Sequence, residues 1–238
     1  HGIIVSYTPD APAPAVADLT MGLMYSLLRK VHEANIQLHQ GNWHRYFGKR
    51  LADCSIGLIG AGRVGSLVLK NLQALGCKRI LYYDKKVRFK EENNEQVVFS
   101  DKEEIYKMSD IISLHIPLDI ETKNMITIKE MRLMKKNSFL INTARGGIIN
   151  ERDLCIALQE KLIAGAAIDA FEDEPYSGEL VKNDNCILTA HMGSMTADCR
   201  ARMEIEATEE AIRFLNGDVL QRKVPEDEYE VQRGGFVT

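Results

Sequence analysis

The chain has 238 residues, of which 45% are hydrophobic, and a formal net charge of −4 at pH 7. This composition is typical of a globular chain with a sizeable core, and the lack of a basic excess argues against a nucleic-acid partner. Its apolar runs are shorter than the roughly 18 residues of a membrane span, and its start does not follow the pattern of a signal peptide. We therefore expect a cytoplasmic protein that does not bind membranes.

The five cysteines are widely spaced and form no CxxC pair. We interpret them as reduced core residues and predict no metal site. They are Cys54, Cys77, Cys155, Cys186 and Cys199.

The first fifty residues contain one strong helical pattern. Residues 2–5 (GIIV) read as a buried strand that starts abruptly, which suggests that a further segment precedes it. After a proline-containing stretch, residues 15–31 have the apolar spacing of a helix. Residues 32–50 are polar and predicted to be irregular. Because they also hold Trp43 and Phe47, this arm is either a partner surface or a segment that docks on its own chain.

Residues 54–65 carry the pattern around which the predicted fold is organised. A short apolar run leads into a glycine-rich turn, and residues 66–76 then show helical spacing. Gly60 would permit the sharp turn, Gly62 would leave room for a pyrophosphate, and Gly65 would let helix and strand pack closely. The phosphates would meet the free N–H groups of the helix N-terminus. This pattern predicts a dinucleotide site.

Asp84 lies at the end of the next predicted strand, nineteen residues after Gly65. A carboxylate at this place can accept hydrogen bonds from the 2′-hydroxyl of an adenosine ribose, and it repels a 2′-phosphate. NAD is therefore favoured over NADP. Lys85 and Lys86 leave tolerance of NADP open, because basic residues can hold a phosphate. Glycine-rich turns also serve packing alone, but here strand, turn, helix and acid coincide.

The rest of the chain alternates short apolar strands with helices. Strands are predicted at residues 97–99, 111–117, 138–142, 165–169 and 186–189, and helices at residues 100–108, 128–135, 151–162 and 196–215. This alternation predicts an α/β fold with a doubly wound parallel sheet of the Rossmann type. Ligands bind at the carboxyl ends of such strands, so the residues just past each strand are the candidates for function.

Five motifs follow one another along the chain. They are GAGRVG at residues 60–65, SLHIP at 113–117, NTARGG at 142–147, DAFEDEP at 169–175 and HMGSMT at 191–196. In this order they resemble the signatures of the NAD-dependent D-isomer-specific 2-hydroxyacid dehydrogenases, and the resemblance runs from about residue 2 to about residue 217. It implies hydride transfer between NAD(H) and a small 2-keto or D-2-hydroxy acid such as glyoxylate, hydroxypyruvate, phosphohydroxypyruvate or pyruvate.

The resemblance implies three catalytic residues with suitable chemistry. His191 would give a proton to the carbonyl oxygen, because imidazole titrates near neutrality. Glu174 would orient that ring and favour its charged form. Arg145 would bind the substrate carboxylate and carbonyl through paired N–H groups. From the residues alone Asp169 could equally pair with His191, and only the family pattern selects Glu174 from its acidic neighbours.

The resemblance also assigns further contacts to NAD, mostly through backbone groups. They are Arg63 and Val64 at the pyrophosphate, Ile116 and Pro117 near the adenosine, and Thr143, Ala144, Asp169 and Gly193 around the nicotinamide.

Two departures from the family pattern stand out. Ala190 occupies the place where proline commonly precedes the catalytic histidine, and the N-terminal substrate lobe of the family is missing from the chain. A related formate dehydrogenase is a second enzyme hypothesis, but such enzymes typically lack the glutamate partner that Glu174 supplies here. An NAD(H)-sensing binding protein of the corepressor type is a hypothesis from another class, and only turnover or a protein partner would distinguish it.

The domain prediction assigns residues 1–217 to an NAD-binding domain and residues 218–238 to a polar C-terminal tail. Within the domain, the helix at residues 15–31 and the arm at residues 32–50 resemble the dimerisation elements of the family. We therefore predict a homodimer.

Overall fold

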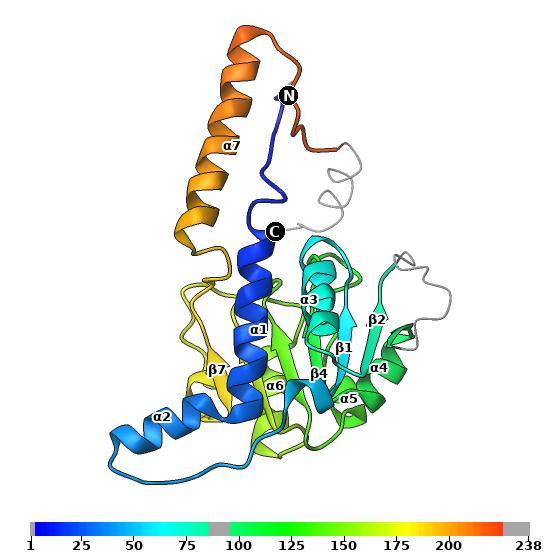
Figure 1. Ribbon diagram of the computed structural model, residues 1–238, viewed down its shortest axis with the longest axis vertical. Helices are drawn as coiled ribbons and strands as arrows, with labels where there is room; N and C mark the ends of the chain where they lie inside the picture. The colour runs from blue at the N-terminus through cyan, green and yellow to red at the C-terminus, as the bar shows by residue number, and fades with distance from the viewer. Residues whose placement is uncertain (1–2, 86–95, 226–238) are drawn as a thin grey trace.

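The computed structural model describes residues 3–85 and 96–225, and within them a seven-stranded parallel sheet forms the centre (Figure 1). The strand order is β3-β2-β1-β4-β5-β6-β7, and each neighbouring pair is parallel. The strands are β1 (Ser55–Ile59), β2 (Arg79–Tyr83), β3 (Val97–Phe99), β4 (Ile111–Leu114), β5 (Phe139–Asn142), β6 (Gly165–Ile168) and β7 (Cys186–Leu188). The order reverses direction at β1, as a doubly wound fold requires, so the predicted fold class is confirmed.

Helices cover both faces of the sheet, and the sheet separates two hydrophobic clusters of the core. On one face, α1 (Ala13–Arg29) and α3 (Arg63–Ala74) pack over residues such as Ile56 and Ile80. On the other face, α4 (Lys102–Met108), α5 (Ile128–Leu133) and α6 (Glu151–Gln159) pack over residues such as Ile112. Because strands buried on both faces need apolar residues at nearly every position, the short continuous apolar runs form the central strands.

The predicted helix at residues 15–31 corresponds to α1, and a sharp turn separates it from a second helix. α1 ends at Arg29, Lys30 has a left-handed φ of 53°, and α2 (Val31–His39) follows at a different angle (Figure 1). The prediction that residues 32–50 are irregular is therefore wrong for α2. None of the α2 residues is buried, so no apolar stripe marks this helix in the sequence.

Both ends of the described chain meet along α7 (Ala197–Asn216), which extends away from the sheet (Figure 1). Residues 3–5 do not form the predicted strand. Ser6 instead makes a single antiparallel bridge with Lys223, and the Tyr7 amide donates to the Arg222 carbonyl over 3.0 Å. Residues 218–225, which the domain prediction assigns to a tail, thus contact the N-terminal segment, and residues 226–238 lie outside the described residues.

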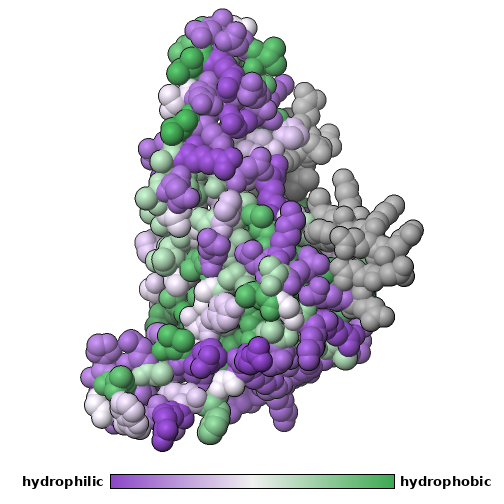
Figure 2. All heavy atoms as spheres, viewed as in Figure 1, coloured by the Kyte–Doolittle hydropathy of each residue, from purple (hydrophilic) through white to green (hydrophobic). Residues whose placement is uncertain are grey.

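Two buried glutamates of α7 hold this returning segment. The amide of Arg222 donates to Glu210 over 3.0 Å, and the Arg222 guanidinium lies 3.4 Å from Glu206. Both carboxylates are buried and also meet arginines of their own helix, so their charges are paired. Figure 2 shows hydrophobic residues at the far end of α7, where Phe214 and Leu215 are exposed.

Two sequence predictions about composition can be compared directly with the structure. All five cysteines are buried free thiols, which confirms their interpretation as reduced core residues. Among the described residues, no helix has the length and apolar character needed to span a membrane. The charged stretch at residues 86–95 lies outside the described residues.

Replacing Leu72 of α3 tests the packing of the core between α3 and the sheet, next to the glycine turn. Leu72 is fully buried, whereas Leu75, the residue that follows the end of the helix, is 44% exposed. We expect Leu72→Ala to lower the free energy of unfolding by about 2–5 kcal/mol, because it leaves a cavity under β1. Leu75→Ala should change it by about 0.5 kcal/mol or less. Urea denaturation of the two variants measures the difference, and equal losses would contradict the assigned packing.

Candidate active site

Polar and glycine residues gather where the parallel strands end. The chain leaves β1 at Gly60, β2 at Asp84, β4 at His115, β5 at Thr143, β6 at Asp169 and β7 at Thr189. Since all seven strands of the described sheet run in parallel, these positions share one edge of the sheet. This edge therefore contains the candidate site.

The glycine turn after β1 has the geometry that the sequence predicts. Gly60 has a φ of +100°, and a Cβ there would overlap the His115 carbonyl. A Cβ on Gly65 would overlap the Gly60 carbonyl, so α3 can approach β1 only with glycine at this place. At Gly62, in contrast, no described atom lies within 4 Å of a built Cβ. The turn thus leaves open space at the N-terminus of α3, where N–H groups can meet an anion.

Asp84 is fixed beside this turn. Its Oδ2 accepts a hydrogen bond from the Ala61 amide over 2.8 Å, so the carboxylate is held at the glycine turn. Ile116 packs against Gly60 on the neighbouring strand end, and Pro117 follows it. These three residues are placed together as the sequence predicts for an adenosine-binding wall.

Arg63 and Val64 begin α3 but differ in their surroundings. Val64 is partly buried against the core, so only its backbone is available at the turn. The Arg63 Nε donates to Asp10 over 2.8 Å, and its guanidinium lies 5.9 Å from the centre of the Tyr7 ring. The side chain of Arg63 is therefore held by the N-terminal segment.

Asp169 is buried and organises the loop that carries His191. Its Oδ1 accepts hydrogen bonds from the Thr189 hydroxyl (2.6 Å) and the Met192 amide (2.9 Å), and its Oδ2 accepts one from the Gly193 amide (2.9 Å). The His191 amide also donates to the Asp169 carbonyl over 2.8 Å. These bonds hold His191 at a left-handed φ of 47°, a conformation that costs energy in a residue with a side chain.

The imidazole of His191 pairs with Glu174. Its Nδ1 lies 2.8 Å from Glu174 Oε2, while the other carboxylate oxygen accepts a bond from the Phe171 amide over 2.9 Å. An ionised carboxylate only accepts hydrogen bonds, so Nδ1 carries the proton and Nε2 faces away from Glu174. The structure thus decides between the two acids, because the Asp169 carboxylate binds the loop and not the ring.

The pKa of Glu174 reflects these contacts. Partial burial opposes ionisation, but the Phe171 amide, the His191 ring and the positive charge of Arg145 together lower the pKa of Glu174 below its usual value. Glu174 is therefore charged at neutral pH and can stabilise a positive charge on His191.

The loop that carries Arg145 lies against the loop of Glu174 because two backbones approach closely. A Cβ on Gly146 would overlap the backbone of Phe171 and Glu172, so glycine lets the loop after β5 press against the loop that carries Glu174. The Arg145 side chain is exposed and donates to the Ala144 carbonyl over 2.7 Å. The close approach at Gly146 is thus one between two loops of this chain.

Three supporting residues were not predicted from the sequence. Asn142 braces the loop after β5, because it donates to the Arg145 carbonyl (2.8 Å) and accepts from the Ala144 amide (3.0 Å). Thr20 of α1 shares a buried hydrogen bond of 2.8 Å with Thr143. Thr189 binds Asp169, as described above. Asn142 and Thr189 are polar residues at the ends of apolar strands, and that signal could have marked them.

A cavity of about 610 Å³ opens beside the His191–Glu174 pair. Apart from these two residues, its lining is mostly apolar and includes Phe171, Tyr176 and Leu188. An apolar wall strengthens electrostatic interactions near it, because the local dielectric constant is lower than that of water.

Comparison with known proteins assigns the chain to a family. The family described as D-isomer specific 2-hydroxyacid dehydrogenase, NAD binding domain, matches residues 21–193. The chain belongs to this family. The resemblance seen in the sequence, the enzyme class and the NAD cofactor are thereby confirmed.

Three members illustrate the similarity. A glyoxylate reductase from Thermofilum pendens is 39% identical over 92% of this chain and 67% of its own length. A D-lactate dehydrogenase from Lactobacillus jensenii, solved with NAD⁺, has 28% identity and a TM-score of 0.83 over 94% of this chain and 72% of that one. An NADPH-dependent glyoxylate/hydroxypyruvate reductase from Sinorhizobium meliloti, solved with NADP and malonate, has 27% identity and a TM-score of 0.85 over 94% and 71%.

The glycine turn fits the cofactor that this dehydrogenase family binds. The open space at Gly62 is a cradle that any side chain would fill, and the Asp84 carboxylate lies at its side. We expect Gly62→Ala to weaken NADH binding by about tenfold or more, because the methyl group would meet the pyrophosphate, while the melting temperature stays the same. NADH fluorescence titration and thermal unfolding measure the two quantities.

Gly65→Ala is the matched change at the same turn. Its Cβ would overlap the Gly60 carbonyl, so it should lower the melting temperature as well as NADH affinity. If Gly62→Ala bound NADH as tightly as the unchanged protein, the cradle would be wrongly placed.

Proposed function

We propose that this dehydrogenase reduces a small 2-keto acid to the D-2-hydroxy acid, with His191, Glu174 and Arg145 as its catalytic residues. The observation that carries the proposal is the 2.8 Å contact between His191 Nδ1 and Glu174 Oε2, with Arg145 close enough to affect the Glu174 carboxyl. The pair lies at the same sheet edge as the glycine turn, so a cofactor bound there would reach it.

Each residue has a defined task. The nicotinamide, when bound, supplies or takes the hydride. His191 gives a proton through Nε2 to the carbonyl oxygen of the substrate, and recovers it in the reverse direction. Glu174 accepts a hydrogen bond from Nδ1–H and stabilises the imidazolium that is present before the transfer. Arg145 binds the substrate carboxylate and polarises the carbonyl through its fixed N–H groups.

The nicotinamide half of the cofactor would lie between the loops after β5 and β6. Asp169 Oδ2 has one hydrogen bond from Gly193, and a carboxylate oxygen can accept two, so it can also accept one from the nicotinamide amide. Thr143 and Ala144 would line the other side of the ring. At the other end of the cofactor, Asp84 would bind the adenosine ribose.

Glyoxylate and hydroxypyruvate are the first substrates to test. The similar protein from Thermofilum pendens is a glyoxylate reductase, and the one from Sinorhizobium meliloti is a glyoxylate/hydroxypyruvate reductase. Both acids are compact molecules that an arginine and a histidine can bind together. Phosphohydroxypyruvate and pyruvate complete the panel.

The competing proposal is an NAD(H)-sensing protein without turnover. Such a protein could keep the same cofactor residues and the His191–Glu174 pair, so this geometry fits both proposals. Turnover of a 2-keto acid favours the enzyme, and a protein partner without turnover favours the sensor.

Replacing the proton donor tests the catalytic proposal. We expect His191→Gln to lower kcat for the best 2-keto acid by about 10²–10⁴, because glutamine cannot give up a proton, while NADH still binds. Glu174→Gln should lower kcat as well, because the ring loses a charged partner. NADH absorbance at 340 nm and fluorescence titration measure kcat and binding.

Glu172→Gln is the matched control for Glu174→Gln. Glu172 is an exposed acid of the same run, with Lys123 3.7 Å away and no hydrogen bond from its side chain to the His191 ring among the contacts of the described residues. Its replacement should leave kcat within about twofold, as surface substitutions usually do. Equal losses in the two glutamine variants, or full turnover by His191→Gln, would contradict the assigned roles.

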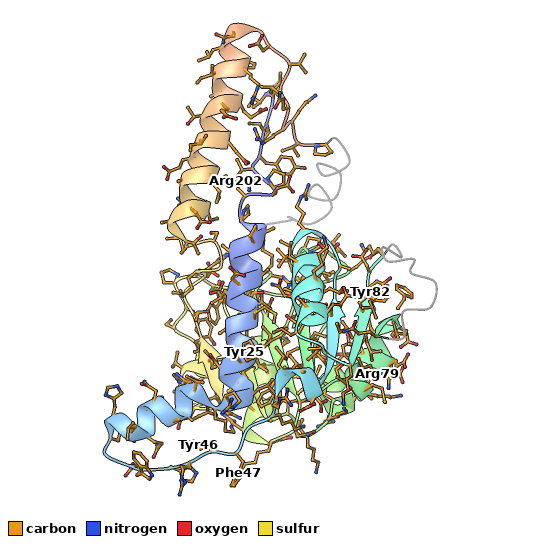
Figure 3. All side chains as sticks on the ribbon, viewed as in Figure 1. Tyr25, Tyr46, Phe47, Arg79, Tyr82 and Arg202 are labelled. Atoms are coloured by element: carbon orange, nitrogen blue, oxygen red, sulfur yellow. The ribbon has the colours of Figure 1, made fainter. Side chains whose placement is uncertain are left out.

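We also propose that the chain forms a homodimer through α2 and residues 40–47. A nine-residue helix is marginal in water by itself, yet none of the α2 side chains is buried in the single chain. Trp43 and Phe47, which follow α2, are 81% and 100% exposed. Figure 3 shows Tyr46 and Phe47 on the segment that runs below α1, which carries the exposed Tyr25. An apolar surface of this kind favours a second copy as its cover.

Light scattering at micromolar concentration tests the dimer. We expect about twice the chain mass of 26.8 kDa for the unchanged protein, and the single mass for the double variant Trp43→Ser, Phe47→Ser, because two large apolar contacts are lost. Met108→Ser, at an exposed methionine of α4, should remain dimeric. A monomer in the unchanged protein would rule out this interface.

The domain division and the cytoplasmic location stay predictions. The contacts between residues 218–225 and the N-terminal segment support treating these two stretches as one unit rather than as domain and tail.

A further inference from the structure

Lys85 follows Asp84 directly, yet its ammonium group is held by two acids from another loop. Its Nζ lies 3.0 Å from Glu121 Oε2 and 3.5 Å from Asp119 Oδ2. The hydrogen bond to Glu121 is the main reason that the pKa of Lys85 is raised, so the lysine is charged and paired. Lys85, one of the two lysines that left NADP tolerance open in the sequence, is therefore already engaged, and Lys86 lies outside the described residues.

The two acids sit on a rigid turn. The Asp119 carboxylate accepts a hydrogen bond from the Thr122 amide over 2.8 Å, and the Asp119 amide donates to the Thr122 hydroxyl over 2.7 Å. The same hydroxyl donates to the Pro117 carbonyl over 2.7 Å, and Thr122 is buried. The position of Asp119 is thus fixed relative to Pro117 at the end of β4.

The ion pairs connect the two walls of the adenosine end of the site. Asp84 and Lys85 follow β2, and the turn with Asp119 and Glu121 follows β4, while β1 with its glycine turn lies between these strands. The pairs therefore cross the carboxyl end of β1 beside the Asp84 carboxylate. A phosphate on the ribose 2′-oxygen would lie close to Asp84 and would need a nearby cation to offset that charge.

We propose that Glu121 and Asp119 are specificity residues that keep Lys85 from binding the 2′-phosphate of NADP. The inference rests on the proposed contact between Asp84 and the ribose. With Lys85 bound to two acids, the described charged residues at this end (Asp84, Lys85, Asp119 and Glu121) carry net negative charge, which NAD tolerates and a 2′-phosphate does not. Solved relatives that bind NADP show that the fold itself does not fix this choice. In this chain the choice depends on where one ammonium group is held.

Glu121→Gln is the cleanest test, because the Glu121 side chain is exposed and its ion pair is with Lys85. The change should remove the shorter of the two ion pairs of Lys85, so that the ammonium group can turn toward a 2′-phosphate, and lower the Kd for NADPH about threefold to fivefold at low salt, as expected for one exposed charge pair. The Kd for NADH should stay within about twofold. Fluorescence titration with each cofactor gives both constants without any turnover. Because the groups are exposed, the NADPH gain should shrink at 0.5 M salt.

Combining Glu121→Gln with Lys85→Met tests whether the gain in NADPH affinity comes from Lys85. If the gain comes from the freed ammonium group, the double variant Glu121→Gln, Lys85→Met should lose it. Glu179→Gln, which removes the same charge from an exposed lysine pair near the opposite edge of the sheet, should not change the NADPH affinity. A gain that persists without Lys85, or that also occurs in Glu179→Gln, would overturn the inference.

Asp84→Ala separates this inference from the assignment on which it rests. If Asp84 binds the ribose, its removal should weaken NADH binding. If Asp84→Ala leaves NADH binding unchanged, the adenosine assignment itself is wrong. If it weakens NADH binding while Glu121→Gln changes nothing, only the role of Glu121 and Asp119 is overturned.

Discussion

The buried carboxylate of Asp169 is the contact on which the catalytic geometry depends. Its three hydrogen bonds, from a hydroxyl and two amides, fix the loop after β7 and hold His191 in a left-handed conformation that a side chain would otherwise avoid. Because the loop is fixed in this way, the imidazole meets Glu174 and its other nitrogen is free to face a substrate. Hydrogen bonds to Asp169, at the end of β6, thus hold the strained backbone of His191 in place. A different acid, Glu174, is the one proposed to assist proton transfer.

A second constraint is the close approach of backbones at the strand ends. Gly65 brings α3 against β1, and Gly146 brings the Arg145 loop against the loop of Glu174. In both cases a single methyl group would overlap a backbone carbonyl, so the cofactor cradle and the arginine-glutamate-histidine group depend on glycine in the same physical way. The sheet supplies the platform, and the glycines decide how closely the loops on it can gather.

Much of the fold could be predicted because its determinants are local. Each central strand is a short apolar run buried on both faces, and the glycine turn needs only its own residues and one strand end. The segments that could not be predicted either depend on residues far away in the sequence or bury no side chain in the described part of the chain. Residues 218–225 are ordered by Glu206 and Glu210 of α7 and by the N-terminal segment, and α2 has no buried face to give it a pattern. The site residues followed from motif order, but the choice between Asp169 and Glu174 as partner of His191 needed the positions of the loop amides.

The most direct test of this account is the imidazole ¹⁵N NMR spectrum of His191 in the unchanged protein and in Asp169→Asn. Asparagine keeps the size of the side chain but presents an NH₂ group where a carboxylate oxygen now accepts. The account predicts that Asp169→Asn keeps the fold, as seen by circular dichroism, but loses the Nδ1–H signal of a ring bonded to Glu174. An unchanged His191 spectrum in that variant would contradict the claim that Asp169 positions the catalytic ring.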